Sequence, residues 1–198
     1  WMATDFALER SREAWIKQGR ANVATLSSGY RNEVEDALER YDQLTLLIAF
    51  LHNRGISLPT LQRMVENLRG QTLFNVLYTD TDGHVVASRL ASTNGLSVRE
   101  KPFFLWHQSS VSDELHIEPI DNGIGPLEGR QVIRLSRRLQ DAQGRFDGIV
   151  SIALLPEDLL RFGGDNQLLD GDALGLRFLD GEWLAARKVG TGKSYETR

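Results

Sequence analysis

Three stretches of the sequence decide the fold: Arg99-Glu-Lys-Pro-Phe-Phe-Leu-Trp-His107, Arg130-Gln-Val-Ile-Arg-Leu-Ser-Arg-Arg-Leu139 and Gly144-Arg-Phe-Asp-Gly-Ile-Val-Ser-Ile-Ala-Leu154. The first is rich in aromatic residues, and the other two have the length and composition of β-strands. The polar turn between the strands ends in Gly144, which supplies the backbone angles that a hairpin turn requires. The pattern predicts a loop folded over one face of an antiparallel hairpin, an arrangement that can enclose a ligand.

Two more segments have the same hairpin pattern. Residues 73–79 and 84–88 flank an Asp-Thr-Asp-Gly turn, and residues 175–179 and 182–186 flank an Asp-Gly turn. Hairpins joined in series after a long helical segment favour an antiparallel sheet. The sequence therefore predicts an α+β fold, in which a long N-terminal helix packs on an antiparallel sheet and a second module begins near the C-terminus.

Residues 5–52 are predicted to form one long helix. Apolar residues recur at intervals of three or four from Val23 to Leu51, close to a heptad pattern, and no proline precedes Pro59. A helix of about 45 residues is roughly 65 Å long, more than one small domain needs to cover its core. We expect its second half to pack on its own sheet and its first half to project or to pair with a second copy. A second, short helix is predicted over residues 61–68.

The composition excludes several classes of function. The 198 residues carry a net charge of −4 and no basic cluster, so no nucleic-acid partner is expected. The lack of cysteine excludes thiolate metal sites, cysteine nucleophiles and disulfides. No run of about 18 apolar residues is present that could span a membrane. The predicted organisation is residues 1–52 as the helix, 53–170 as a first module and 171–198 as part of a second.

The order of long helix, hairpin, aromatic loop, hairpin, connector and new hairpin resembles the double-Cache (PDC-like) extracytoplasmic sensor domains of bacterial receptors, of the type found in front of diguanylate cyclases. Residues 99–107, 133–139 and 141–150 carry the resemblance. It implies a PAS-like (Cache) sheet whose membrane-distal module, at 53–170, binds a small ligand. It also implies a periplasmic domain of a bacterial inner-membrane protein that signals as a homodimer through the N-terminal helix.

Seven side chains are predicted to line the ligand pocket. Arg134, Ser136 and Arg138 share one face of their strand, because alternate residues point to the same side. An arginine offers a fork of donors for a carboxylate or phosphate, and Trp106 can stack on a ring or a cation. His107 can donate or accept a hydrogen bond near neutral pH, and Tyr78 is expected close to where the loop folds over. The predicted ligand-binding residues are Tyr78, Arg99, Phe103, Trp106, His107, Arg134 and Ser136.

The sequence departs from the amino-acid-binding subclass of the family at two positions. That subclass carries an arginine two positions before the tryptophan and an aspartate on the strand that leads into the connector. Here these positions are Phe104 and Ala153. The candidate ligands are therefore an aromatic amine, a carboxylate without an amine, or no small molecule at all.

Other functions have weaker support. Residues 161–165, Arg-Phe-Gly-Gly-Asp, resemble the start of a diguanylate cyclase signature, but Asn166 and Gln167 replace the residues that follow it in the enzyme. Asp80 and Asp82 flank a turn without the oxygen series of a calcium loop. No catalytic residue, metal or cofactor is predicted, and the chain itself is not expected to be an enzyme. Two alternatives to a diguanylate cyclase sensor stay open: the sensor of a histidine kinase or chemoreceptor, and a dimerisation or protein-interaction module without a small ligand.

Overall fold

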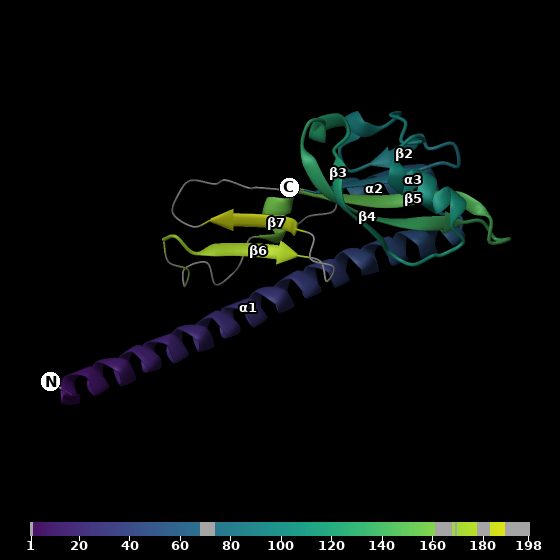
Figure 1. Cartoon of the computed structure of the whole chain (residues 1–198). Helices are drawn as coiled ribbons and strands as arrows, with labels where there is room; N and C mark the ends of the chain where they lie inside the picture. Colours follow the sequence, from purple (N-terminus) through teal and green to yellow (C-terminus); the bar gives the residue numbers. More distant parts are fainter. Residues whose placement is uncertain (1, 68–73, 161–167, 169, 178–182, 189–198) are drawn as a thin grey trace.

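A computed structural model describes residues 2–67, 74–160, 168, 170–177 and 183–188. One helix, α1 (Met2–Asn53), extends from the N-terminus to the sheet domain, which lies against its C-terminal part (Figure 1). The helix α2 (Leu58–Glu66) follows, with a proline in its first turn, where no hydrogen bond is lost. The predicted long N-terminal helix is confirmed. Among the described residues, no helix is long and apolar enough to cross a membrane.

The main sheet has five strands in the order β2-β1-β5-β4-β3, and every neighbouring pair is antiparallel. The strands are β1 (Phe74–Thr79), β2 (Val85–Ser88), β3 (His116–Asn122), β4 (Gln131–Gln140) and β5 (Phe146–Leu154). β1–β2 and β4–β5 are the hairpins that the turn residues predict. The expected α+β fold with an antiparallel sheet is confirmed.

Two elements differ from the expectation. The aromatic segment is a helix rather than a loop: α3 (Pro102–Ser109) opens with a proline, whose fixed φ favours a helix start. The sequence does not predict β3, because Pro119 cannot donate to a strand ladder. The edge position of β3 accommodates this proline, and the pairing with β4 shifts register between Glu118 and Asp121. Short 3-10 turns, η1 (Ala91–Thr93) and η2 (Gly125–Leu127), complete the connections.

The two faces of the sheet carry different layers. α1 and α2 pack on one face over the larger apolar core, to which α1 contributes Ile48 and β4 contributes Leu135. α3 lies against the other face, where Phe103 packs with Leu77 of β1. Successive residues of each strand therefore point either to the long helix or to α3, and this alternation decides which side chains can meet beneath α3.

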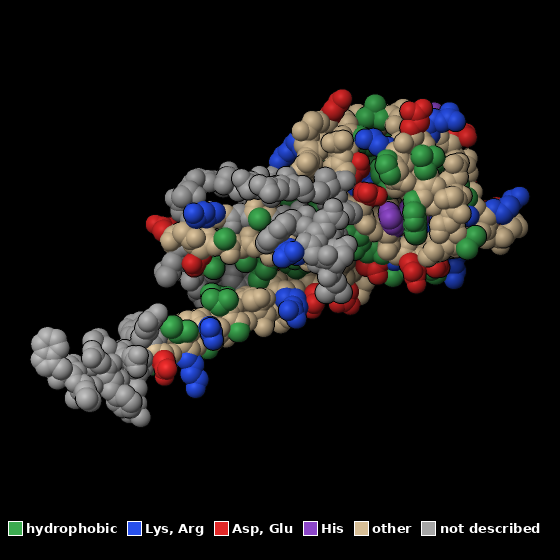
Figure 2. Space-filling model, viewed as in Figure 1, with side chains coloured by type: hydrophobic (Ala, Val, Ile, Leu, Met, Phe, Trp, Pro, Cys, Tyr) green, Lys and Arg blue, Asp and Glu red, His purple; other side chains and the backbone are tan. Residues whose placement is uncertain are grey.

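The apolar residues that recur every three or four positions along α1 pack against the rest of the chain from Tyr30 onward. Tyr30, Val34 and Ile48 are buried, and the recurring apolar residues between them pack against the same cores. Nearer the N-terminus, Ile16 and Val23 are 47% and 66% exposed. Figure 2 shows hydrophobic side chains at the surface of this part of the helix. The prediction that the second half of α1 packs on its own sheet is confirmed.

A second sheet of two strands lies beside α1 (Figure 1). It consists of β6 (Ala173–Arg177) and β7 (Trp183–Lys188), and the short helix α4 (Pro156–Leu159) precedes it. Tyr30 of α1 and Leu174 of β6 belong to a small core between helix and hairpin. The hairpin predicted in this region is therefore present.

Some predictions fall on residues that the structure does not describe. The turn of the last hairpin at 178–182 and the cyclase-like sequence at 161–165 lie outside the described ranges. The division of the chain into modules at residue 170 stays a prediction.

Candidate functional site

Three polar side chains of β4 point toward α3. Arg134, Ser136 and Arg138 alternate along the strand, as predicted, and all three are buried. Burying a charged group is costly unless other groups satisfy its charge and its hydrogen bonds. The partners of these side chains therefore define the site.

Arg134 is held by groups from two neighbouring strands and from α3. Its Nε donates to Asp121 Oδ2 of β3 at 2.5 Å, and its Nη1 donates to Ser151 Oγ of β5 at 3.1 Å. The guanidinium also lies over the Phe103 ring, 4.3 Å from the ring centroid. Burial lowers the pKa of Arg134 and the Asp121 carboxylate opposes that change, so the guanidinium remains charged.

His107 lies between the two arginines, because it contacts the residue midway between them on β4. Its Nε2 is 3.0 Å from Ser136 Oγ, and its backbone carbonyl accepts a hydrogen bond of 2.6 Å from Arg138 Nη1. Burial, and then the nearby His116, lower the pKa of His107 to about 4. The imidazole is therefore neutral near pH 7.

The same layer holds three buried nitrogen atoms that have no hydrogen-bond partner among the described residues: His107 Nδ1, Arg134 Nη2 and Arg138 Nε. A buried polar group without a partner costs about 1–3 kcal/mol. Folded proteins leave few such groups, so three of them under one short helix mark this layer as a binding-site candidate. We call Arg134, Ser136, Arg138 and His107 the polar layer.

Trp106 and His116 border the polar layer. Their rings stack with centroids 4.2 Å apart and an interplanar angle of 17°, and the Trp106 ring also meets the His107 ring edge-on at 4.7 Å. Trp106 is 37% exposed, whereas His107 is fully buried. Trp106 is thus a partly exposed ring next to the buried histidine.

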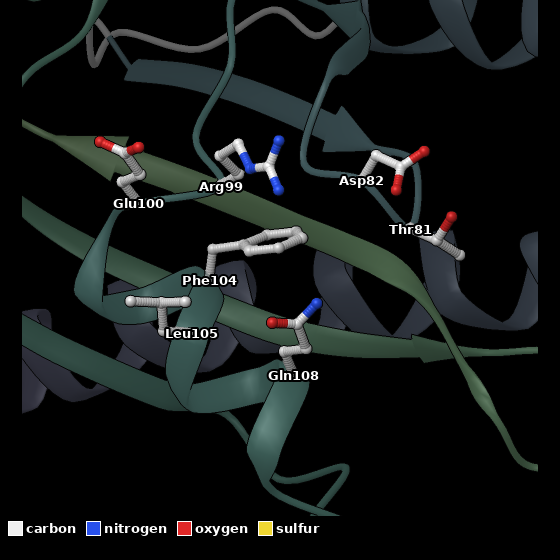
Figure 3. Close-up of a pocket in the computed structure, with 7 residues that line it drawn as sticks. All are labelled: Thr81, Asp82, Arg99, Glu100, Phe104, Leu105 and Gln108. Atoms are coloured by element: carbon white, nitrogen blue, oxygen red, sulfur yellow. The ribbon is translucent and has the colours of Figure 1, made fainter.

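Arg99 belongs to a separate, open pocket on another side of α3. This pocket has a volume of about 360 Å³. In Figure 3 the Phe104 ring lies between Arg99 and Gln108, and Thr81 and Asp82 of the β1–β2 turn lie to one side of them. The lining residues are Thr81, Asp82, Arg99, Glu100, Phe104, Leu105 and Gln108, none of which is in the polar layer.

The structure corrects the expected position of Tyr78. It shares its side of β1 with Val76 and points toward α1, away from α3. Its hydroxyl is hydrogen-bonded to His52 Nδ1, and His52 Nε2 contacts Asp147 Oδ2 at 2.9 Å. Burial, followed by the Asp147 charge, raises the pKa of Tyr78. The group joins the end of α1 to β1 and β5.

Of the seven predicted residues, the structure brings five together: Phe103, Trp106, His107, Arg134 and Ser136. Sequence reasoning missed the partners Asp121, Ser151 and His116, and it placed Arg138 on the same strand face without including it among the ligand-binding residues. Only Arg138 gave a usable signal, because it alternates with Arg134 and Ser136. Ala153, where the amino-acid-binding subclass has an aspartate, pairs directly with Arg134 across β4 and β5. The carboxylate for Arg134 comes instead from Asp121 of β3.

Comparison with solved structures identifies the fold. The extracellular domain of rpHK1S-Z16, assigned as a histidine kinase, matches with a TM-score of 0.69 and 18% identity, over 86% of this chain and 71% of that one. The ligand-binding domain of the Campylobacter jejuni chemoreceptor Tlp3, in complex with L-valine, matches with a TM-score of 0.63 and 14% identity, over 88% and 73%. The ligand-binding domain of the Pseudomonas aeruginosa chemoreceptor PctB, in complex with L-Arg, matches with a TM-score of 0.55 and 20% identity, over 77% of this chain and 64% of that one.

These likenesses show that the chain has the Cache-type fold of extracytoplasmic sensor domains, as the resemblance implies. These neighbours are described as extracellular, sensory or ligand-binding domains of receptors. No family model matches the chain, and no curated protein matches it.

Proposed function

We propose that this chain is the extracytoplasmic sensing domain of a membrane receptor, and that a small molecule binds between α3 and the polar layer of β4. The carrying observation is the cluster of three buried, unpartnered nitrogens beneath a helix of eight residues. A ligand that bonds these atoms would offset the cost of leaving them unpaired. Solved proteins of this fold include domains in complex with L-valine and L-Arg.

The receptor that we propose is an inner-membrane protein of a bacterium, with this domain in the periplasm. We propose a diguanylate cyclase as its cytoplasmic output, because the motifs at 99–107 and 133–150 resemble those of sensor domains found in front of diguanylate cyclases. A histidine kinase or chemoreceptor output is the alternative, and the structural neighbours belong to these two classes.

The route by which ligand binding would reach α1 runs through Arg137, the neighbour of Arg138. Arg137 points to the other face of β4, where its Nε donates to Thr45 Oγ1 at 3.1 Å and its Nη2 to the carboxylate of Asp42, both on α1. Its Nη1 donates to the carbonyl of Asp113, in the loop that follows α3. A displacement of α3 or of this loop therefore acts on α1, and ligand would favour one arrangement of helix and loop over another.

We propose that the receptor is a homodimer through the projecting part of α1. Ile16 and Val23 are seven residues apart, so they lie on nearly the same side of the helix, and both are exposed. The same observation favours the second candidate function, a dimerisation module without a small ligand. Val23→Glu is expected to lower the dimer fraction in analytical ultracentrifugation, and an unchanged fraction would contradict this interface.

Thermal-shift screening of the whole chain against a library of small metabolites tests the proposed function. We expect compounds that raise the melting temperature of the wild type and of Arg99→Gln but not of Trp106→Ala. A shift that depends on Arg99 and not on Trp106 would place the ligand in the open pocket of Figure 3. If no compound shifts the melting temperature, the sensing function is wrong for this chain and the dimerisation module is favoured.

A further inference from the structure

The charges of the polar layer do not balance within the chain. Arg134 is matched by the Asp121 carboxylate, which it contacts at 2.5 Å. Arg138 makes no ion pair among the described residues. Its guanidinium bonds the His107 carbonyl and lies 4.9 Å from the centroid of the Phe146 ring. Burial lowers its pKa, yet an arginine keeps its proton, so one positive charge of this layer lacks a counter-charge.

The acidic side chains near the layer already have partners. Asp121 is bound to Arg134, and Glu118 contacts His116 at 3.4 Å while remaining partly exposed. The unpartnered atoms, in contrast, are nitrogens of Arg134, Arg138 and His107. A neutral imidazole bonded at Nε2 to Ser136 can present an N–H at Nδ1. The layer therefore offers donors and positive charge.

Arg138 is buried, but it also borders a pocket outside the polar layer. It lines an open pocket of about 230 Å³ at the end of β4. Arg137, Asp113 and Gln140 line the same pocket, and the α1 side is formed by Leu46, Ala49, Phe50 and Asn53. A ligand that reaches Arg138 by this opening would touch α1 directly. Asp113 is the one acidic residue of this lining, and it is exposed.

From these contacts we infer that the sensed molecule is a small organic anion, a carboxylate without a neighbouring ammonium group, and that Arg138 is its main charge partner with His107 beside it. This inference rests on the proposed sensing function and specifies its ligand class. The carboxylate supplies the counter-charge that Arg138 lacks, and charge-assisted bonds from a guanidinium are among the strongest that a protein offers. The Phe146 ring beside the Arg138 guanidinium, together with Leu46 and Phe50 of the pocket, provides apolar surface for the remainder of the molecule.

Two series of matched compounds, one aromatic and one aliphatic, test the inference by calorimetric titration of the whole chain. The probes are 3-phenylpropionate, L-phenylalanine, 3-phenylpropanamide and 2-phenylethylamine, with 4-methylpentanoate, L-leucine and 4-methylpentanamide as an aliphatic series. We expect each carboxylate to bind at least tenfold more tightly than its amide and its amino acid. Arg138→Gln is expected to remove at least tenfold of that affinity, and Arg138→Lys, which keeps the charge, to restore part of it.

Arg99→Gln is the matched control, since it removes an arginine from the open pocket next to α3 and is expected to leave the affinity unchanged. Circular dichroism of each variant confirms that it is folded. An amino acid, amide or amine that binds as tightly as its carboxylate would overturn the inference and leave the sensing function intact. Two further results would overturn the inference and leave the sensing function intact. In one, a carboxylate binds Arg138→Gln as tightly as the wild type; in the other, library compounds bind but none of the carboxylates does. Failure of every compound, the screening library included, would overturn both.

Discussion

The buried histidine makes stability depend on pH in a calculable way. His107 has a pKa of about 4 in the folded chain, against 6.5 for an unperturbed histidine. Between these two values the unfolded chain binds a proton that the folded chain does not. The free energy of unfolding therefore falls as the pH falls from about 6.5 toward 4, and it is fully retained above that window.

The size of the effect follows from the two pKa values. The full window of about 2.5 pH units corresponds to roughly 3 kcal/mol, and the part between pH 7.5 and pH 5 to about 2 kcal/mol. Urea unfolding followed by circular dichroism at pH 7.5, 6.5, 5.75 and 5 measures it. His107→Gln, which can still bond Ser136, is expected to flatten the dependence by about 2 kcal/mol over this range.

Carboxylates that also titrate near pH 5 contribute equally to the wild type and the variant, so the difference between the two isolates His107. His84→Gln is the matched control, because the His84 side chain is 53% exposed in the β1–β2 turn. We expect it to retain the wild-type dependence. If His107→Gln and the wild type lose the same stability between pH 7.5 and pH 5, the imidazole is not held neutral beneath α3.

Two stability predictions concern the sheet. Arg137→Met removes the hydrogen bonds and the ion pair to α1 and is expected to lower the free energy of unfolding in urea by about 1–3 kcal/mol. Arg145→Met is the control, because the Arg145 side chain is 76% exposed, and it should change this free energy by no more than about 0.5 kcal/mol. Equal losses in the two variants would contradict the role of Arg137 in coupling the sheet to α1. Gly148→Ala is expected to abolish cooperative folding, because its Cβ would lie 2.1 Å from the Thr79 carbonyl oxygen at a φ of +107°. At Gly144 the φ is +77° and an added Cβ would meet no atom closer than 3.9 Å, so Gly144→Ala should lower the free energy of unfolding by only about 1–2 kcal/mol. A similar loss of stability in the two glycine variants would refute the close approach of β1 and β5.

The hairpins and the facing of β4 could be predicted from the sequence because both are local properties. The Asp/Gly turns fix where strands reverse, and the period of two places Arg134 and Ser136 on one face and Ile133 and Leu135 on the other. Burial of the second half of α1 follows in the same way from the spacing of its apolar residues.

The parts that were missed depend on contacts between distant residues. α3 has only eight residues, and its aromatic composition does not distinguish a helix from a loop. The pairing of Arg134 with Asp121 depends on the register shift of β3, a strand that contains a proline. Tyr78 was expected close to the folded segment, but its sequence neighbours do not indicate which side of β1 meets α3, and its side chain points to α1. The unpaired charge of Arg138 becomes visible only when every neighbour is in place.

Hydrogen exchange with and without a carboxylate of the series above tests the central claim most directly. We expect slower exchange in α3, in residues 134–138 of β4 and in the loop around Asp113, together with a change in residues 42–53 of α1. Arg137→Met should retain the first effects and lose the change in α1. Protection confined to the β1–β2 turn and Arg99, or no change anywhere in the chain, would contradict a sensing site beneath α3 that acts on the long helix.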